Sequence, residues 1–173
     1  MTNRMDDRDD PTYVPALGHA WPTTVYDPVV RVTTREVTFK KVLLGLARLE
    51  VNLVRGLGDR LPFPDRSFDR VVSSLFFHHL DLEAKGRISA EIFRVLSPGG
   101  ELHVADWGEP TNPLMRALFL PIQVLDGFAN TGDNVRGLLP RVFEASGFEN
   151  VGTQGNLSTA FGTLSYVAGH KPI

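Results

Sequence analysis

The chain has 173 residues, of which 42% are hydrophobic and 22% are charged, and its formal net charge is −2. These values are typical of a globular protein with one domain and exclude collagen-like, low-complexity and wholly disordered chains. The balanced charge argues against a general basic surface for nucleic acid, and the lack of cysteine excludes disulfides, thiolate metal sites and cysteine nucleophiles.

The N-terminal end and the apolar segments predict a cytoplasmic protein. Residues 1–10 are acidic and polar, and they lack the apolar stretch of a secretory signal peptide. Uncharged apolar runs stay shorter than the roughly 20 residues that cross a bilayer. We therefore expect no membrane span.

The first part of the chain predicts an N-terminal arm followed by a single domain over residues 31–173. Aspartates crowd residues 6–10 and favour a disordered start, whereas the aromatic residues that follow within 1–30 favour packing. Apolar residues at helical spacing predict a helix over 33–49. A short strand over 51–54 is expected next.

The middle of the chain predicts strands that alternate with a helix. The apolar run 68–77 is typical of a strand buried on both faces of a parallel sheet. Asp81 stands where it would cap a helix with one apolar stripe. The turn at 97–100 ends that helix, and residues 101–107 are expected to form the next strand.

The segment 112–128 is apolar on almost all sides. Asn112 followed by proline predicts a helix start, and Pro121 is expected to kink or break the helix. Burial in the core is the first interpretation of this segment. A lid over an apolar acceptor and a dimer face are the alternatives.

The C-terminal part predicts one helix and two strands. Asp133 is expected to cap an amphipathic helix that stops at Gly147. Strands over about 149–154 and 161–169 are separated by a short connection, which predicts an antiparallel pair. The order of elements predicts an α/β fold, a mostly parallel sheet with a C-terminal antiparallel hairpin and helices on both faces.

Ligands of such sheets bind at the carboxyl ends of the strands. That rule points to residues 56–59, 74–79 and 106–107. The glycines of 56–59 lack the third glycine of a dinucleotide-binding loop, so a turn is the preferred interpretation.

Three residues at these strand ends are the catalytic candidates: His78, His79 and Asp106. A histidine there would serve as a general base because its ordinary pKa lies near neutrality, and a structural or capping role is the alternative. Neighbouring histidines point in different directions, and His103 and Asp106 would face opposite sides of a strand. We therefore expect no metal site.

Three segments in succession resemble class I S-adenosylmethionine-dependent methyltransferases. They are the loop GDRLPFPDRSFD at 58–69, the strand and turn at 71–80, and the helix and turn at 91–100. The resemblance covers about residues 20–170 and is strongest to the ubiquinone/menaquinone-biosynthesis type. It implies S-adenosylmethionine as cofactor and a small apolar or aromatic molecule as methyl acceptor.

The resemblance also implies cofactor-binding positions. The loop would contact the adenine, the strand end would lie beside the methionine part, and one histidine would line the cofactor or acceptor pocket. The loop positions are Gly58, Asp59, Arg60 and Leu61, the strand-end positions are Ser74, Leu75 and Phe76, and the histidine is His79.

The sequence departs from the family at the glycine-rich loop, because it contains no E/D-x-G-x-G-x-G segment. Two strand–helix units are missing, on the order of 50 residues at ~30 per βαβ unit. The fold is thus expected to be a truncated Rossmann-like sheet in which residues 51–55 pair beside 71–75, with a homodimer through an exposed sheet edge as the alternative.

This departure leaves three functions open. The first is a methyltransferase whose activity is weak or lost, the second is a non-catalytic binding or partner module, and the third is an enzyme of another class.

Overall fold

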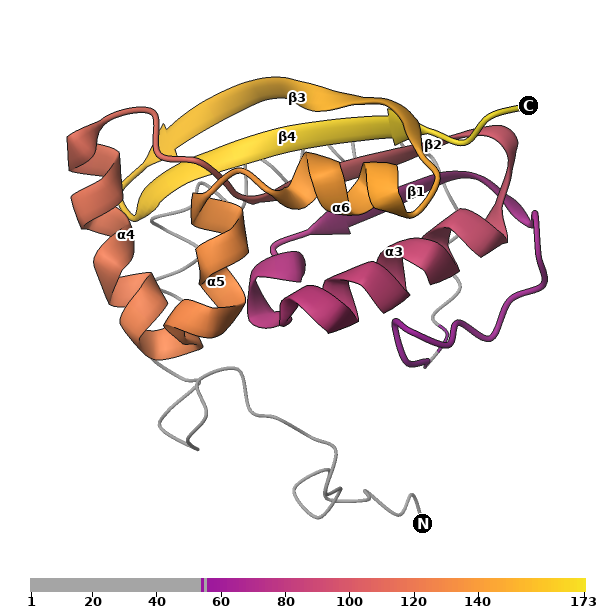
Figure 1. The fold of residues 1–173 in the computed structure, drawn as a ribbon, viewed down its shortest axis with the longest axis horizontal. Helices are drawn as coiled ribbons and strands as arrows, with labels where there is room; N and C mark the ends of the chain where they lie inside the picture. Colours follow the sequence, from indigo (N-terminus) through magenta and orange to yellow (C-terminus); the bar gives the residue numbers. More distant parts are fainter. Residues whose placement is uncertain (1–53, 55) are drawn as a thin grey trace, which may run out of the picture.

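Figure 1 shows the computed structural model, which describes residue 54 and residues 56–173. Its sheet has four strands in the order β1-β2-β4-β3. The predictions for the arm 1–30, the helix 33–49 and the pairing of residues 51–55 lie outside the described residues.

The strands confirm an α/β fold with a C-terminal hairpin. Strand β1 (Phe68–Ser74) pairs parallel with β2 (Leu96–Trp107), and β4 (Gly162–His170) pairs antiparallel with both β2 and β3 (Glu149–Thr159). Hence β1 forms one edge of the described sheet.

The expectation that 68–77 is one strand buried on both faces was wrong. Leu75 has a φ of 50°, which ends β1 at Ser74, and the short 3₁₀ helix η2 (Phe77–His79) follows. Val72 is 48% exposed. Described helices cover one side of β1, so alternate side chains on its other side keep contact with solvent.

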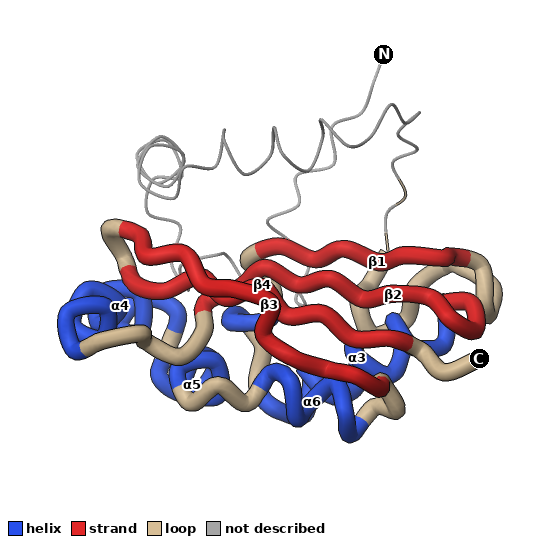
Figure 2. Tube along the Cα trace, turned by 90° about the horizontal axis from the view of Figure 1, so that it is seen from above, coloured by secondary structure: helices blue, strands red, loops and turns tan. Residues whose placement is uncertain are grey.

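The described helices lie on one side of the sheet, as Figure 2 shows. They are α3 (Leu82–Val95), α4 (Pro113–Asp126), α5 (Phe128–Val135) and α6 (Leu139–Ala145). The expectation of helices on both faces is therefore confirmed for one face within 56–173. None of these helices is long and apolar enough to cross a membrane.

Two predicted helix starts are confirmed. The Asp81 carboxylate accepts a hydrogen bond from the Ala84 backbone N–H at 2.7 Å, and the Asn112 side chain accepts one from Met115 N–H at 2.9 Å. These caps satisfy backbone donors that have no partner within the first turn.

Pro121 lies inside α4, so the predicted break of this helix does not occur. Proline removes one backbone hydrogen bond. Buried side chains before and after it, including Phe119 and Gln123, hold both halves of α4 in place.

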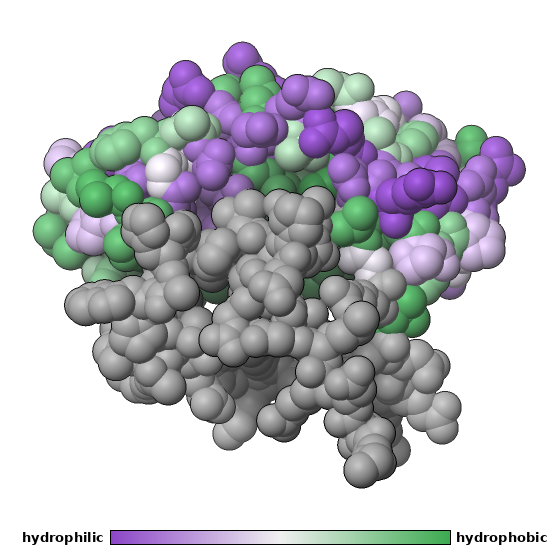
Figure 3. Space-filling view, turned by 90° about the horizontal axis from the view of Figure 1, so that it is seen from below, coloured by the Kyte–Doolittle hydropathy of each residue, from purple (hydrophilic) through white to green (hydrophobic). Residues whose placement is uncertain are grey.

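The prediction that 112–128 is core was only partly right. Figure 3 shows hydrophobic residues gathered at the α4 end of the molecule. Exposed side chains there are Leu114, Leu120, Val124, Leu125 and Phe128.

The prediction that Asp133 caps one long helix was wrong. Asp133 is buried within α5, and α5 and α6 are separate helices. Gly137 has a φ of 67°, which interrupts helical geometry, and Pro140 occupies the first turn of α6. Gly147, with a φ of 100°, ends the helical region as expected.

The main core lies between the sheet and helices α3 and α6. Phe77, Leu96, Leu102 and Phe143 are completely buried within it. A second cluster, made by Trp107, Phe119 and Leu164, packs α4 against the carboxyl end of β2. Both clusters border η2, so core packing fixes the position of its two histidines.

Candidate functional site

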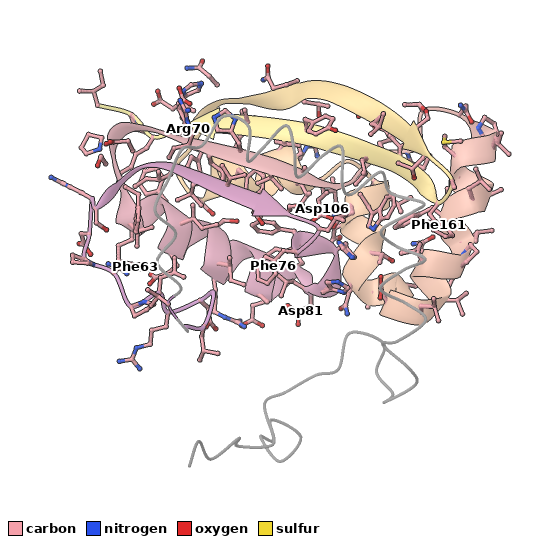
Figure 4. The ribbon with its side chains drawn as sticks, turned by 180° about the vertical axis from the view of Figure 1, so that it is seen from behind. Phe63, Arg70, Phe76, Asp81, Asp106 and Phe161 are labelled. Atoms are coloured by element: carbon pink, nitrogen blue, oxygen red, sulfur yellow. The ribbon has the colours of Figure 1, made fainter. Side chains whose placement is uncertain are left out.

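The carboxyl ends of β1 and β2 meet at one end of the sheet. Leu75 donates its backbone N–H to the Ala105 carbonyl at 2.8 Å, which joins the two strand ends. Figure 4 shows Phe76 and Asp106 close together there, near Asp81 at the start of α3. The structure thus brings together the segments 74–79 and 106–107.

Asp106 organises this end of the sheet. Its Oδ2 accepts the backbone N–H groups of Phe76 at 3.0 Å and Phe77 at 2.7 Å. Its Oδ1 accepts from His78 Nδ1 and from the Trp107 backbone N–H, both at 2.7 Å. The side chain is 1% exposed. All four of these hydrogen bonds are made inside the protein, and they tie the end of β2 to the turn after β1.

The Asp106 contact fixes the tautomer of His78. An ionised carboxylate can only accept, so His78 Nδ1 carries a proton, and in the neutral ring Nε2 carries the lone pair. That Nε2 atom lies 3.7 Å from Asp126 Oδ2. His78 is buried, and its ring does not face solvent.

His79 is the more accessible histidine of the pair, with 35% of its side chain exposed. Its ring centroid lies 3.9 Å from that of His78, and its Nδ1 lies 3.8 Å from Asp126 Oδ1. Burial, and then the neighbouring His78, lower the pKa of His79 to about 4. His79 is therefore neutral at pH 7 and carries a free lone pair.

Asp126 belongs to this cluster although sequence reasoning missed it. Its side chain is 4% exposed at the end of α4, and Oδ1 has no hydrogen-bond partner among the described residues. Burial raises the pKa of Asp126. The signal in the sequence was a lone carboxylate at the end of an apolar helix, directly before Gly127.

The loop expected to contact adenine runs beside this cluster. Its turn is closed by a hydrogen bond from Arg60 N–H to the Leu57 carbonyl at 3.1 Å. A Cβ at Gly58 would stand 3.3 Å from the Phe76 ring and 3.2 Å from Ile88. The loop therefore passes close to the turn after β1.

The other residues expected to bind the cofactor lie at the end of β1 and in the loop beside α3. Ser74 is exposed at the end of β1, and Phe76 is 38% exposed. Asp59 is exposed and lies 3.7 Å from the Arg87 guanidinium, and Leu61 anchors the loop to Glu91 on α3.

We predict that Glu91→Gln destabilises the chain in a pH-dependent way. Hydrogen bonds from Arg94, and then the Leu61 backbone N–H, lower the pKa of Glu91 below its ordinary 4.5. The lowered pKa means that Glu91 stabilises the fold above about pH 4.5, and that this stabilisation is lost as the pH falls through the lowered pKa. Urea denaturation at pH 7 should show a loss of about 1–2 kcal/mol.

The control for this prediction is Glu83→Gln, because the Glu83 side chain is 83% exposed and, within residues 56–173, pairs only with Arg87 on the same helix. Its expected effect is about 0.3–0.5 kcal/mol at pH 7. A Glu91→Gln deficit that stays constant from pH 7 to pH 3 would contradict the predicted linkage.

A cavity of about 330 Å³ lies on the other side of Trp107. Its polar lining includes Asn134, Asn156 and Ser165. Neither histidine of η2 lines it, so this cavity is separate from the cluster around Asp126.

Comparison with known proteins bears on the family and the fold. Residues 20–104 match the methyltransferase domain family. The chain is 36% identical over 100 residues to a ubiquinone/menaquinone biosynthesis C-methyltransferase of Bordetella avium, covering 58% of this chain and 36% of that protein. It is 32% identical over 153 residues to a demethylmenaquinone methyltransferase of Corynebacterium urealyticum, covering 75% of this chain and 64% of that protein. The chain thus spans less than two thirds of these relatives.

Solved structures share the fold. An S-adenosylmethionine-dependent methyltransferase from Thermotoga maritima aligns with a TM-score of 0.54 at 20% identity, over 70% of this chain and 64% of that one. Human N-acetylserotonin methyltransferase aligns with a TM-score of 0.54 at 13% identity, over 69% and 33%. In its sequence motifs, its fold and these matches, the chain is similar to the class I S-adenosylmethionine-dependent methyltransferases of the ubiquinone/menaquinone-biosynthesis type.

Proposed function

We propose that this chain acts in S-adenosylmethionine-dependent methyl transfer to a small aromatic acceptor related to quinones. The observation that carries the proposal is the turn after β1, where Asp106 orients His78, His79 stacks on His78, and the Phe76 ring lies next to Gly58. The names of the relatives, which act in ubiquinone and menaquinone biosynthesis, support the acceptor class.

The described residues fit two parts of this cofactor. The partly exposed Phe76 ring, which lies next to Gly58, offers a surface for a flat base. Ser74 and Leu75 lie at the strand end assigned to the methionine part. When bound, S-adenosylmethionine supplies a methyl group from its sulfonium.

The protein's own contribution is alignment and proton removal. Methyl transfer depends largely on holding the reacting atoms in line. Because His79 is neutral and accessible, we assign to it the removal of the acceptor proton, while the Asp106–His78 pair holds the turn in place. An acceptor that loses no proton would not need this base.

The second candidate function is a non-catalytic binding or partner module. The absence of an E/D-x-G-x-G-x-G segment from the sequence favours it, since that loop normally holds the methionine moiety. The two functions differ in whether the chain binds the cofactor at all.

Calorimetric titration of the full chain with S-adenosylmethionine and its demethylated product tests the proposal. We expect dissociation constants between about 1 μM and 1 mM, or about −8 to −4 kcal/mol. Methyl transfer to quinone-like phenols should follow, and His79→Ala should lower its rate about 10²-fold without changing cofactor affinity.

The matched control is His103→Ala, because His103 is a partly exposed histidine on β2 that pairs with Glu101. It should leave both binding and rate unchanged. No heat with either ligand up to millimolar concentration, together with no methyl transfer, would overturn the proposal in favour of a binding module.

A further inference from the structure

In the buried cluster, a histidine nitrogen lies close to a carboxylate oxygen. The Asp106 contact places the proton of His78 on Nδ1, so the Nε2 lone pair is directed toward Asp126 Oδ2 at 3.7 Å. Asp126 Oδ1 is buried without a hydrogen-bond partner in the described chain. A lone pair opposite a carboxylate oxygen is stabilised by a cation between them, either a proton or a metal ion.

His79 adds a third ligand atom to the same point. One ligand atom from each of His78, His79 and Asp126 can be chosen so that all three lie within 4.8 Å of one another. A tetrahedral zinc site with metal–ligand distances of about 2.0–2.2 Å places its ligand atoms about 3.3–3.6 Å apart. His78 Nε2 lies 3.7 Å from Asp126 Oδ2, and His79 Nδ1 lies 3.8 Å from Asp126 Oδ1. A small movement of the partly exposed His79 and of the Asp126 carboxylate would bring the ligand atoms to the separations of a zinc site.

The surroundings match those of a metal centre. Asp106 accepts a hydrogen bond from His78 Nδ1, which leaves His78 Nε2 to bind an ion. A carboxylate in this position commonly orients a histidine that binds a metal. Among the described residues, neither Asp106 nor Asp126 forms an ion pair with lysine or arginine. Two buried carboxylates therefore share two imidazoles, and a divalent cation would balance their charge.

We propose that His78, His79 and Asp126 bind one divalent transition-metal ion of the Zn²⁺ class. Two imidazoles and one carboxylate suit Zn²⁺ and leave a fourth position open, as in catalytic zinc sites. An aromatic hydroxyl is a ligand that fits this position. Metal binding goes beyond the proposed function and is measured separately from cofactor binding, so either can fail without the other. The base role assigned to His79 applies to the metal-free chain.

The test uses the full chain, freed of metal by dialysis against a chelator. Zn²⁺ alone is titrated by calorimetry, and Co²⁺ alone is followed by its visible absorption. We expect one ion per chain with a dissociation constant of about 1 μM or lower. Asp126→Asn and His79→Ala should each weaken binding at least tenfold, whereas His103→Ala should bind as the parent does.

Circular dichroism of each variant shows whether it is folded, and His79→Ala, which changes a partly exposed side chain, is the safer of the two. Absence of binding up to about 1 mM Zn²⁺ would overturn the proposal and leave a proton as the cation between His78 and Asp126. Binding that persists in both site variants, or that disappears in His103→Ala, would equally overturn it.

Discussion

Replacing Asp106 by alanine is expected to lower the free energy of unfolding by about 3–5 kcal/mol. The change leaves the backbone N–H groups of Phe76 and Phe77 and the Nδ1–H of His78 without their buried acceptor. A buried donor without a partner destabilises the folded state by its full desolvation free energy. Urea denaturation followed by the fluorescence of the buried Trp107 measures the loss.

Asp106→Asn should cost less than Asp106→Ala, because one acceptor oxygen remains. Asp69→Ala is the matched control, since Asp69 is exposed on β1, and it should change stability by less than about 0.5 kcal/mol. If Asp106→Ala and Asp69→Ala lowered the free energy of unfolding equally, Asp106 would not organise the turn after β1.

Replacing Lys85 by alanine is expected to have an effect of similar size, about 3–5 kcal/mol. Lys85 is completely buried in α3, and its Nζ donates to the Asn130 carbonyl at 2.6 Å and to Asp133 Oδ2 at 3.5 Å. Burial lowers the pKa of Lys85, while Asp133 opposes this shift. Loss of the ammonium leaves the buried Asp133 carboxylate with Arg136 as its remaining cation and opens a cavity between α3 and α5.

Lys85→Met separates the two causes, because it removes the charge but keeps most of the volume. We expect its loss of stability to be smaller than that of Lys85→Ala. Arg87→Ala, on the half-exposed side of the same helix, should cost no more than about 1 kcal/mol. Lys85→Ala with a midpoint in urea like that of Arg87→Ala would show that the buried pair does not hold α5 in place.

Both predictions depend on contacts between distant parts of the chain that border the site. Asp106 ties the end of β2 to η2, and Lys85 ties α3 to α5, which follows directly after Asp126. The position of the His78–His79–Asp126 cluster therefore depends on buried polar contacts as well as on hydrophobic packing.

The sequence by itself determined most of the local elements and the resemblance to the methyltransferase family. The helix starts at Asp81 and Asn112 could be predicted because a cap depends on a side chain and the backbone of the next turn. The hairpin of β3 and β4 followed from alternating strands with a short connection. The motif order from 58 to 100 identified the methyltransferase family, and the strand-end rule pointed to residues 74–79 and 106–107.

Only the tertiary structure decided how polar groups are buried. Helical spacing around Asp133 predicted a cap, whereas contact with Lys85 makes it an interior partner. Asp126 lies at the end of α4, 48 positions after His78 in the chain. No local sequence pattern therefore connects the two residues. Burial and charge pairing depend on which surfaces meet in the folded protein, and local periodicity does not contain that information.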